Sequence, residues 1–133
     1  MTSRARWVRR AADKRPLTIS GNAGSSTNSR TWSTYAAASR STAGAGIGYV
    51  LGDGIGCWDF DHCIVDGALA DWAREAIDGI PDPLLVEVSQ SGEGVHVFVE
   101  AAEGPGRRIR DGRNIEFYSS GRYIAVTGIK LTL

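Results

Sequence analysis

Two aspartates interrupt an otherwise apolar strand in the segment from Gly56 to His62 (GCWDFDH). Successive side chains on a strand point to opposite faces, so Asp59 and Asp61 share one face while Trp58 and Phe60 share the other. Aspartate is depleted from strand interiors. Two carboxylates about 6–7 Å apart also repel each other unless a cation lies between them. A divalent cation with oxygen ligands would resolve both problems, and a solvated polar strand edge is the alternative.

The size and composition of the chain fit one globular domain. It has 133 residues, of which 42% are hydrophobic, enough for a core. No apolar run reaches 18 residues, and no apolar stretch follows the basic N-terminus, so we expect neither a membrane-spanning helix nor a secretory signal. Cys57 and Cys63 are too few for a disulfide framework or a zinc site. We expect free thiols in a reduced, cytoplasmic protein.

The formal net charge of zero hides a strong segregation along the chain. Residues 1–45 carry eight basic groups and one acid, residues 46–103 one basic group and twelve acids, and residues 104–133 six basic groups and two acids. Thirteen of the fifteen basic residues are arginine, whose planar fork matches phosphate geometry. Basic ends folded around the acidic centre would place phosphate-binding groups beside a metal site.

Hydrophobic periodicity predicts one clear helix and several strands. Apolar residues recur at helical spacing from Leu69 to Ile80, and Pro81 bars continuation. Strand patterns form a pair over residues 47–61, a second pair at 84–88 and 95–100, and a last pair at 114–118 and 122–127. The expected fold class is α+β, with a small mixed or antiparallel sheet and flanking helices.

Two further segments of the sequence place polar residues on or beside predicted strands. The turn Ser91-Gly92-Glu93-Gly94 precedes His96, and a glycine-rich turn can direct backbone N–H groups at an anion. Glu116 interrupts the apolar strand that also contains Ile115 and Phe117. Each of these side chains would hold a rigid position because it sits on or beside a strand.

The sequence resembles the primase-polymerase domain of phage and plasmid replication proteins. The resemblance is carried by the two-aspartate segment, the glycine-rich turn with His96 and the strand of Glu116, followed by Gly121-Arg122-Tyr123 and Val126-Thr127-Gly128. That domain belongs to the archaeo-eukaryotic primase superfamily. The resemblance runs from about Lys14 to Gly128. It implies an RRM-like catalytic core over residues 46–128 and an N-terminal α/β unit that includes the basic segment 1–45, all within one domain spanning 1–133.

The resemblance also implies roles for individual residues. Asp59, Asp61 and Glu116 match the acids that hold Mg²⁺ or Mn²⁺, and with His96 they form the catalytic set. His96 matches the histidine that contacts the phosphates of the incoming nucleotide, and the other nucleotide-binding candidates are Ser91, Gly92 and Arg122. The chemistry agrees, because nucleotidyl transfer needs carboxylates to hold paired metal ions and positive groups to meet the triphosphate.

The implied activity is DNA primase or DNA polymerase, with nucleoside triphosphates and a single-stranded DNA template or primer as partners. Family proteins commonly carry a C-terminal helicase, so here a helicase would be supplied separately. For a phage protein the expected location is the host cytoplasm. The middle of the chain is too acidic to hold a phosphate backbone. The candidate nucleic-acid contacts are therefore Lys14, Arg15, Arg107, Arg108, Arg110 and Arg113.

Two other classes compete with this interpretation. A primase-like module could hold nucleotide or single-stranded DNA without turnover. A different enzyme class, a metal-dependent nuclease or a rolling-circle replication initiator, also uses a small sheet with acids and histidines. The initiator needs paired histidines around an apolar residue, whereas His62 and His96 stand alone in this sequence.

Overall fold

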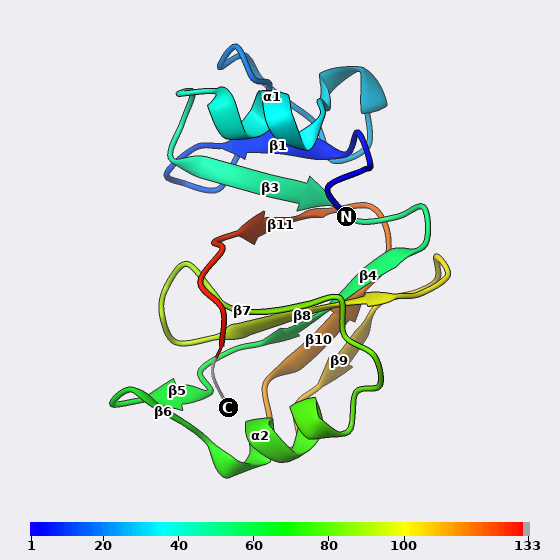
Figure 1. Cartoon of the computed structure of the whole chain (residues 1–133). Coiled ribbons are helices and arrows are strands. Elements are labelled where there is room, and N and C mark those ends of the chain that lie inside the picture. The colour runs from blue at the N-terminus through cyan, green and yellow to red at the C-terminus, as the bar shows by residue number, and fades with distance from the viewer. Residues whose placement is uncertain (132–133) are drawn as a thin grey trace. The chain divides into compact units, whose positions relative to one another are not determined.

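The computed structural model describes residues 1–131, which form two compact units (Figure 1). Unit 1 comprises Met1–Leu51 and Ser120–Val126, and unit 2 comprises Gly52–Ser119 and the residues from Thr127 onward. The strand pairs of both units are antiparallel. The predicted α+β class with antiparallel sheets is thereby confirmed.

Unit 1 is a four-stranded sheet covered on one face by a short helix. The strand order is β11-β3-β1-β2, with β1 at Trp7–Arg10, β2 at Pro16–Leu17, β3 at Gly46–Val50 and β11 at Tyr123–Val126. A 3-10 turn, η1 (Ser29–Thr31), precedes helix α1 (Tyr35–Arg40), whose first turn is capped by the Thr34 hydroxyl accepting from the Ala37 N–H. The Trp7 ring packs edge-on against Tyr35 with 4.9 Å between ring centroids, which holds α1 on β1.

Unit 2 is built on a five-stranded sheet of order β7-β8-β4-β10-β9. The strands are β4 (Ile55–Phe60), β7 (Leu85–Val88), β8 (Val95–Glu100), β9 (Arg107–Ile109) and β10 (Ile115–Tyr118). A small hairpin of β5 (Ile64–Val65) and β6 (Ala68–Leu69) leads into helix α2 (Asp71–Asp78). No helix within residues 1–131 is long and apolar enough to cross a membrane.

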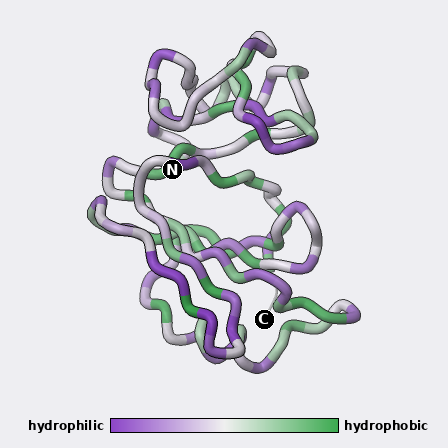
Figure 2. Tube along the Cα trace, turned by 180° about the vertical axis from the view of Figure 1, so that it is seen from behind, coloured by the Kyte–Doolittle hydropathy of each residue, from purple (hydrophilic) through white to green (hydrophobic). Residues whose placement is uncertain are grey.

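Apolar residues on one face of this sheet form the core against α2. Phe60, Val95, Val97 and Ile115 are buried together with Ile77 of the helix. Hydrophilic and hydrophobic residues alternate along the strands, as Figure 2 shows by colour. The two faces of the sheet therefore differ in character, apolar towards α2 and largely polar on the other side.

Two of the predicted strand pairs are wrong. β3 and β4 were expected to pair across the Gly52–Gly54 turn, but they lie in different sheets and share only the isolated bridge between Gly52 and Ile55. Likewise, β10 and β11 do not pair across Ser119–Gly121. Both turns are points where the chain passes from one unit to the other. The predicted pairing of residues 84–88 with 95–100 is confirmed as β7–β8.

The core predicts a contrast within α2. Ile77→Ala removes a side chain that is only 5% exposed, so the free energy of unfolding should fall by about 2–5 kcal/mol. Asp78→Ala, at the exposed next position, should change it by less than about 0.5 kcal/mol. Urea denaturation followed by circular dichroism measures both. Equal losses in the two variants would contradict the packing of α2 described here.

Candidate functional site

One row of polar side chains crosses the five-stranded sheet on the face opposite α2. Read from β7 to β9, directly opposed residues in this row are Glu87, His96, Asp59, Glu116 and Arg108. Opposed residues on antiparallel strands share a face, with Cβ atoms about 4.5–5.5 Å apart. The structure thus brings Asp59, His96 and Glu116 side by side, although Asp59 and Glu116 are far apart in sequence.

The buried carboxylate of Glu87 holds the neighbouring side chain of the row, His96, in place. Glu87 is fully buried, and its two oxygens accept hydrogen bonds from the backbone N–H groups of Thr127 (3.0 Å) and Gly128 (3.2 Å). Nδ1 of His96 lies 3.1 Å from Glu87 Oε2. Because the carboxylate accepts in all these contacts, Nδ1 is the donor, and the imidazole is held in one orientation.

That orientation turns the other ring nitrogen of His96 towards the aspartate. Nε2 lies 3.9 Å from Oδ1 of Asp59. The His96 side chain is 9% exposed and that of Asp59 25% exposed, so the row opens towards solvent at Asp59. With Nδ1 engaged by Glu87, Nε2 is the ring nitrogen that faces the Asp59 side of the row.

Asp61 and the glycine-rich turn lie together at the end of β4. Asp61 follows the last residue of the strand and is exposed, with its N–H donating to the Asn114 carbonyl. A Cβ on Gly94 would stand 2.6 Å from the Phe60 carbonyl oxygen and 3.5 Å from Asp61 Oδ1. The turn can therefore press against this strand end only because residue 94 is glycine.

Hydroxyl groups hold the turn in shape. Ser89 Oγ accepts from the Gly94 N–H (3.0 Å), and Ser91 Oγ accepts from the Glu93 N–H (3.1 Å). Gly92 has a φ of +79°, and both Ser91 and Gly92 are exposed. The sequence-predicted nucleotide contacts Ser91 and Gly92 are thus accessible and lie at the tip of the loop that leads directly into the strand of His96.

Glu116 is engaged by two arginines. Its Oε1 lies 2.9 Å from Arg110 Nη2 and 3.4 Å from Arg108 Nε. Within residues 1–131, no group of three or more His, Cys, Asp and Glu side chains is arranged to hold a metal ion. The donor set still suits Mg²⁺ or Mn²⁺, which prefer carboxylate oxygens.

The arginines of the 107–113 segment do not act as one group. Arg108 and Arg110 reach Glu116 on the polar face, whereas Arg107 is opposite Phe117, whose ring packs 4.6 Å from Trp58. Arg113 forms an ion pair with Asp111 at 2.6 Å, which lowers the pKa of that carboxyl to about 2.

Three predicted contacts belong to unit 1. Lys14 and Arg15 are exposed, and the Arg15 guanidinium pairs with Asp13 at 2.8 Å. The Arg122 carbonyl accepts from the Leu51 N–H within the same unit. A position of these side chains beside the Asp59 row stays a prediction.

Both cysteines are buried free thiols, as the sequence predicted. Burial raises the pKa of the Cys57 thiol well above its usual value and that of Cys63 to about 11. Both side chains are therefore thiols rather than thiolates near neutral pH.

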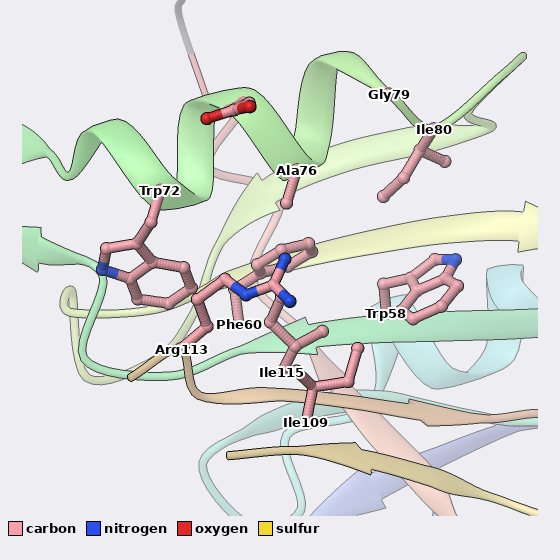
Figure 3. Close-up of a pocket in the computed structure, with 10 residues that line it drawn as sticks. Trp58, Phe60, Trp72, Ala76, Gly79, Ile80, Ile109, Arg113 and Ile115 are labelled. Atoms are coloured by element: carbon pink, nitrogen blue, oxygen red, sulfur yellow. The ribbon is translucent and has the colours of Figure 1, made fainter. Parts of the chain in front are cut away.

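A cavity of about 440 Å³ lies on the other side of the sheet, between the strands and α2. Trp58 and Trp72 stand at its two ends, and Arg113 extends into it (Figure 3). Because Trp58 faces away from Asp59 on β4, this cavity is separate from the polar row.

Sequence reasoning missed Glu87 as a site residue. The signal was present, because Glu87 interrupts the apolar strand Leu85–Val88 as Asp59 interrupts β4. The sequence alone does not say that this acid is fully buried or that it contacts the histidine of the next strand.

The buried carboxylate predicts a stability difference between two acids of the same sheet. Glu87→Ala leaves His96 Nδ1 and two backbone N–H groups without their acceptor, so the free energy of unfolding should fall by about 3 kcal/mol or more. Glu100→Ala, at an exposed position on β8, should cost less than about 0.5 kcal/mol. Urea unfolding tests both, and similar small changes in the two variants would argue against the buried contact.

Comparison with known proteins agrees with the motif-based resemblance. No family model matches the chain. The sequence is 34% identical over 92 residues to a DNA primase-polymerase of Nitratiruptor phage NrS-1. The aligned region covers 62% of this chain, which spans only 12% of the length of that protein. This modest similarity supports the suggestion of a primase-polymerase relationship.

Proposed function

We propose that this chain provides the catalytic centre of a metal-dependent nucleotidyltransferase, acting as a DNA primase or DNA polymerase in phage or plasmid replication. The observation that carries the proposal is the polar row, in which Asp59 stands in register between His96 and Glu116 on one sheet face, with the Asp59 and Glu116 side chains partly accessible. The similarity to a phage DNA primase-polymerase supports the choice of reaction.

In this proposal the carboxylates of Asp59, Asp61 and Glu116 hold Mg²⁺ or Mn²⁺. The bound cations would supply activation of the attacking 3′-oxygen and neutralise charge on the leaving pyrophosphate. Asp61 directly follows the last residue of β4, and Glu116 of β10 is directly opposite Asp59. Glu116 must exchange its contact with Arg110 for the cation, so Arg108 and Arg110 become available for phosphate groups.

His96 contacts the triphosphate of the incoming nucleotide in this arrangement. Glu87 fixes the ring, and Nε2 is the nitrogen left to face the ligand. The exposed tip at Ser91 and Gly92 lies in the loop before His96, and the Ser91 hydroxyl would be its donor to the ligand. The Gly92 N–H already donates to the Ser89 carbonyl, so a phosphate at Gly92 would have to replace that bond. Template and primer DNA would lie along basic side chains, for which Lys14, Arg15, Arg107 and Arg113 remain the candidates, while Arg122 stays a candidate for the nucleotide.

Carboxylate replacement tests catalysis. Asp59→Asn and Asp61→Asn should each reduce nucleotide incorporation by about 100-fold or more, because each removes negative charge needed at the reacting centre. Primer extension with Mn²⁺ and all four deoxynucleotides is the measurement. Asp66→Asn is the matched control, since Asp66 is an exposed acid of unit 2 with a φ of +51° that asparagine tolerates.

Two results would count against the proposal. Primer extension by both variants at the wild-type rate would exclude the carboxylates from catalysis. Nucleotide binding by the wild-type chain without any incorporation would instead favour a non-catalytic nucleotide-binding or single-stranded-DNA-binding module.

The two histidines of the chain offer a test of nucleotide contact. His96→Gln should weaken binding of a labelled deoxynucleoside triphosphate by about tenfold, the loss expected for one charge-assisted hydrogen bond. Mn²⁺ binding, measured by electron paramagnetic resonance, should change less than twofold. His62→Gln is the control, because His62 is exposed beyond the strand end. Equal nucleotide affinity in wild type and His96→Gln would remove His96 from the site.

A further inference from the structure

Arg10 of unit 1 is a buried cation, and two of its guanidinium nitrogens lack a hydrogen-bond partner in the part of the chain that the structure describes. It ends strand β1 and is 9% exposed, and its Nε and Nη1 atoms have no partner within residues 1–131. Its neighbours differ. Arg9 donates to the carbonyls of Ala43 (2.6 Å) and Ala38 (3.2 Å), and Arg6 donates to those of Val50 and Leu51 (both 2.8 Å). An unpaired buried charge is costly, so Arg10 calls for an explanation that Arg6 and Arg9 do not.

Glycines of the neighbouring strand make room for this guanidinium. A Cβ on Gly46 would stand 2.8 Å from Arg10 Nη2 and 3.0 Å from both Cζ and Nε, so the guanidinium lies flat over the Gly46 backbone. Two residues further along β3, a Cβ on Gly48 would collide with the ring of Tyr123. Both glycines lie on one face of β3, and any larger residue would displace Arg10 or Tyr123.

Unit 1 offers no carboxylate to neutralise Arg10. Its residues include nine arginines and lysines but a single acid, Asp13, and that carboxylate is bonded to Arg15. Burial, together with the nearby charge of Arg10, lowers the pKa of Arg9, which shows that the two cations oppose each other. Within unit 1, Arg10 therefore has neither the carbonyl acceptors that Arg6 and Arg9 have for their guanidinium groups nor a free carboxylate.

The surroundings of Arg10 suit an oxyanion. Tyr123 lies on the adjacent glycine and donates its hydroxyl proton to the Lys14 carbonyl, which holds the backbone of Lys14 near this face of the sheet. Lys14 itself is exposed. An arginine fork binds two oxygens of a phosphate at once, and an aromatic ring beside it restricts where the anion can sit.

We propose that Arg10 is the centre of an oxyanion site that takes one phosphate group, either a phosphodiester of single-stranded nucleic acid or a phosphate of a nucleotide. The choice of phosphate over other oxyanions rests on the proposed function. The inference that an anion binds here is independent of that function. It rests on the unpaired nitrogens of Arg10, on the close approach of its guanidinium to Gly46, and on the lack of a free carboxylate in unit 1.

Inorganic pyrophosphate is the probe for the site itself. In metal-free buffer of constant ionic strength, pyrophosphate should raise the Tm of the wild-type chain, and Arg10→Met should weaken its binding by at least about tenfold. Arg40→Met removes the same charge from an exposed position of unit 1 and should bind pyrophosphate as the wild type does. Gly46→Ala, which keeps Arg10 but fills the space under it, should also lose binding.

The stability of the variants without pyrophosphate separates an anion site from a structural role. In chloride buffer Arg10→Met should be as stable as the wild type or more stable, because it removes an unpaired buried charge. Arg9→Met should be less stable, since it loses two hydrogen bonds to carbonyl groups. If Arg10→Met is strongly destabilised in chloride, or binds pyrophosphate as tightly as the wild type, the proposal is overturned.

Two further ligands identify the source of the phosphate. With a single-stranded oligo(dT), loss of one phosphodiester contact in Arg10→Met should flatten the slope of log K against log salt by about 0.7. With dTTP in place of DNA, a tenfold loss would identify the nucleotide instead. Primer extension is measured in parallel. If the chain extends primers but Arg10→Met binds pyrophosphate as the wild type does, only the anion site is refuted. If pyrophosphate binding depends on Arg10 but the wild-type chain does not extend primers, only the proposed function is refuted.

Discussion

The buried carboxylate of Glu87 is the contact on which the candidate site depends. It accepts from His96 on the neighbouring strand and from the backbone of Thr127 and Gly128, which joins the returning C-terminal segment to the sheet of unit 2. A buried acid is tolerated only with such partners. A slip of one residue in β8 would turn His96 into the α2 core and expose Val95 and Val97 on the polar face, so the same contact also fixes the strand register.

Structural features that depend on residues close together in the sequence could be predicted. Alternation placed Asp59 and Trp58 on opposite faces, helical spacing located α2, and the glycine-rich turn identified the β7–β8 hairpin. The partners of β3 and β11 could not be predicted in this way. Short glycine-containing turns favour hairpins, but β3 pairs with β1 and β11, which are distant in sequence, because those strands complete the core of unit 1. Local patterns do not encode such pairings.

The charge pattern was informative about regions but not about individual arginines. Eight basic residues among the first 45 suggested a phosphate-binding surface. However, the guanidinium groups of Arg6 and Arg9 donate hydrogen bonds to backbone carbonyl groups of their own unit. Formal charge in a sequence does not reveal whether the five donors of a guanidinium are already satisfied. Among these side chains, Arg10 stands out only when burial and hydrogen bonding are considered together.

Unit 1 is basic and unit 2 is acidic, and this difference affects how nucleotide and cation would bind in the proposed reaction. Unit 2 carries fourteen acids against six basic groups, so its carboxylate row repels a nucleotide unless positive charge is added. Arg108 and Arg110 already neutralise Glu116. Phosphate oxygens compete with Glu116 for these arginines, and a cation competes with the arginines for Glu116. In the proposed enzyme, phosphate binding therefore frees Glu116 for the cation, and cation binding frees the arginines for phosphate. Nucleotide and cation should then bind with positive cooperativity through the two ion pairs of Glu116.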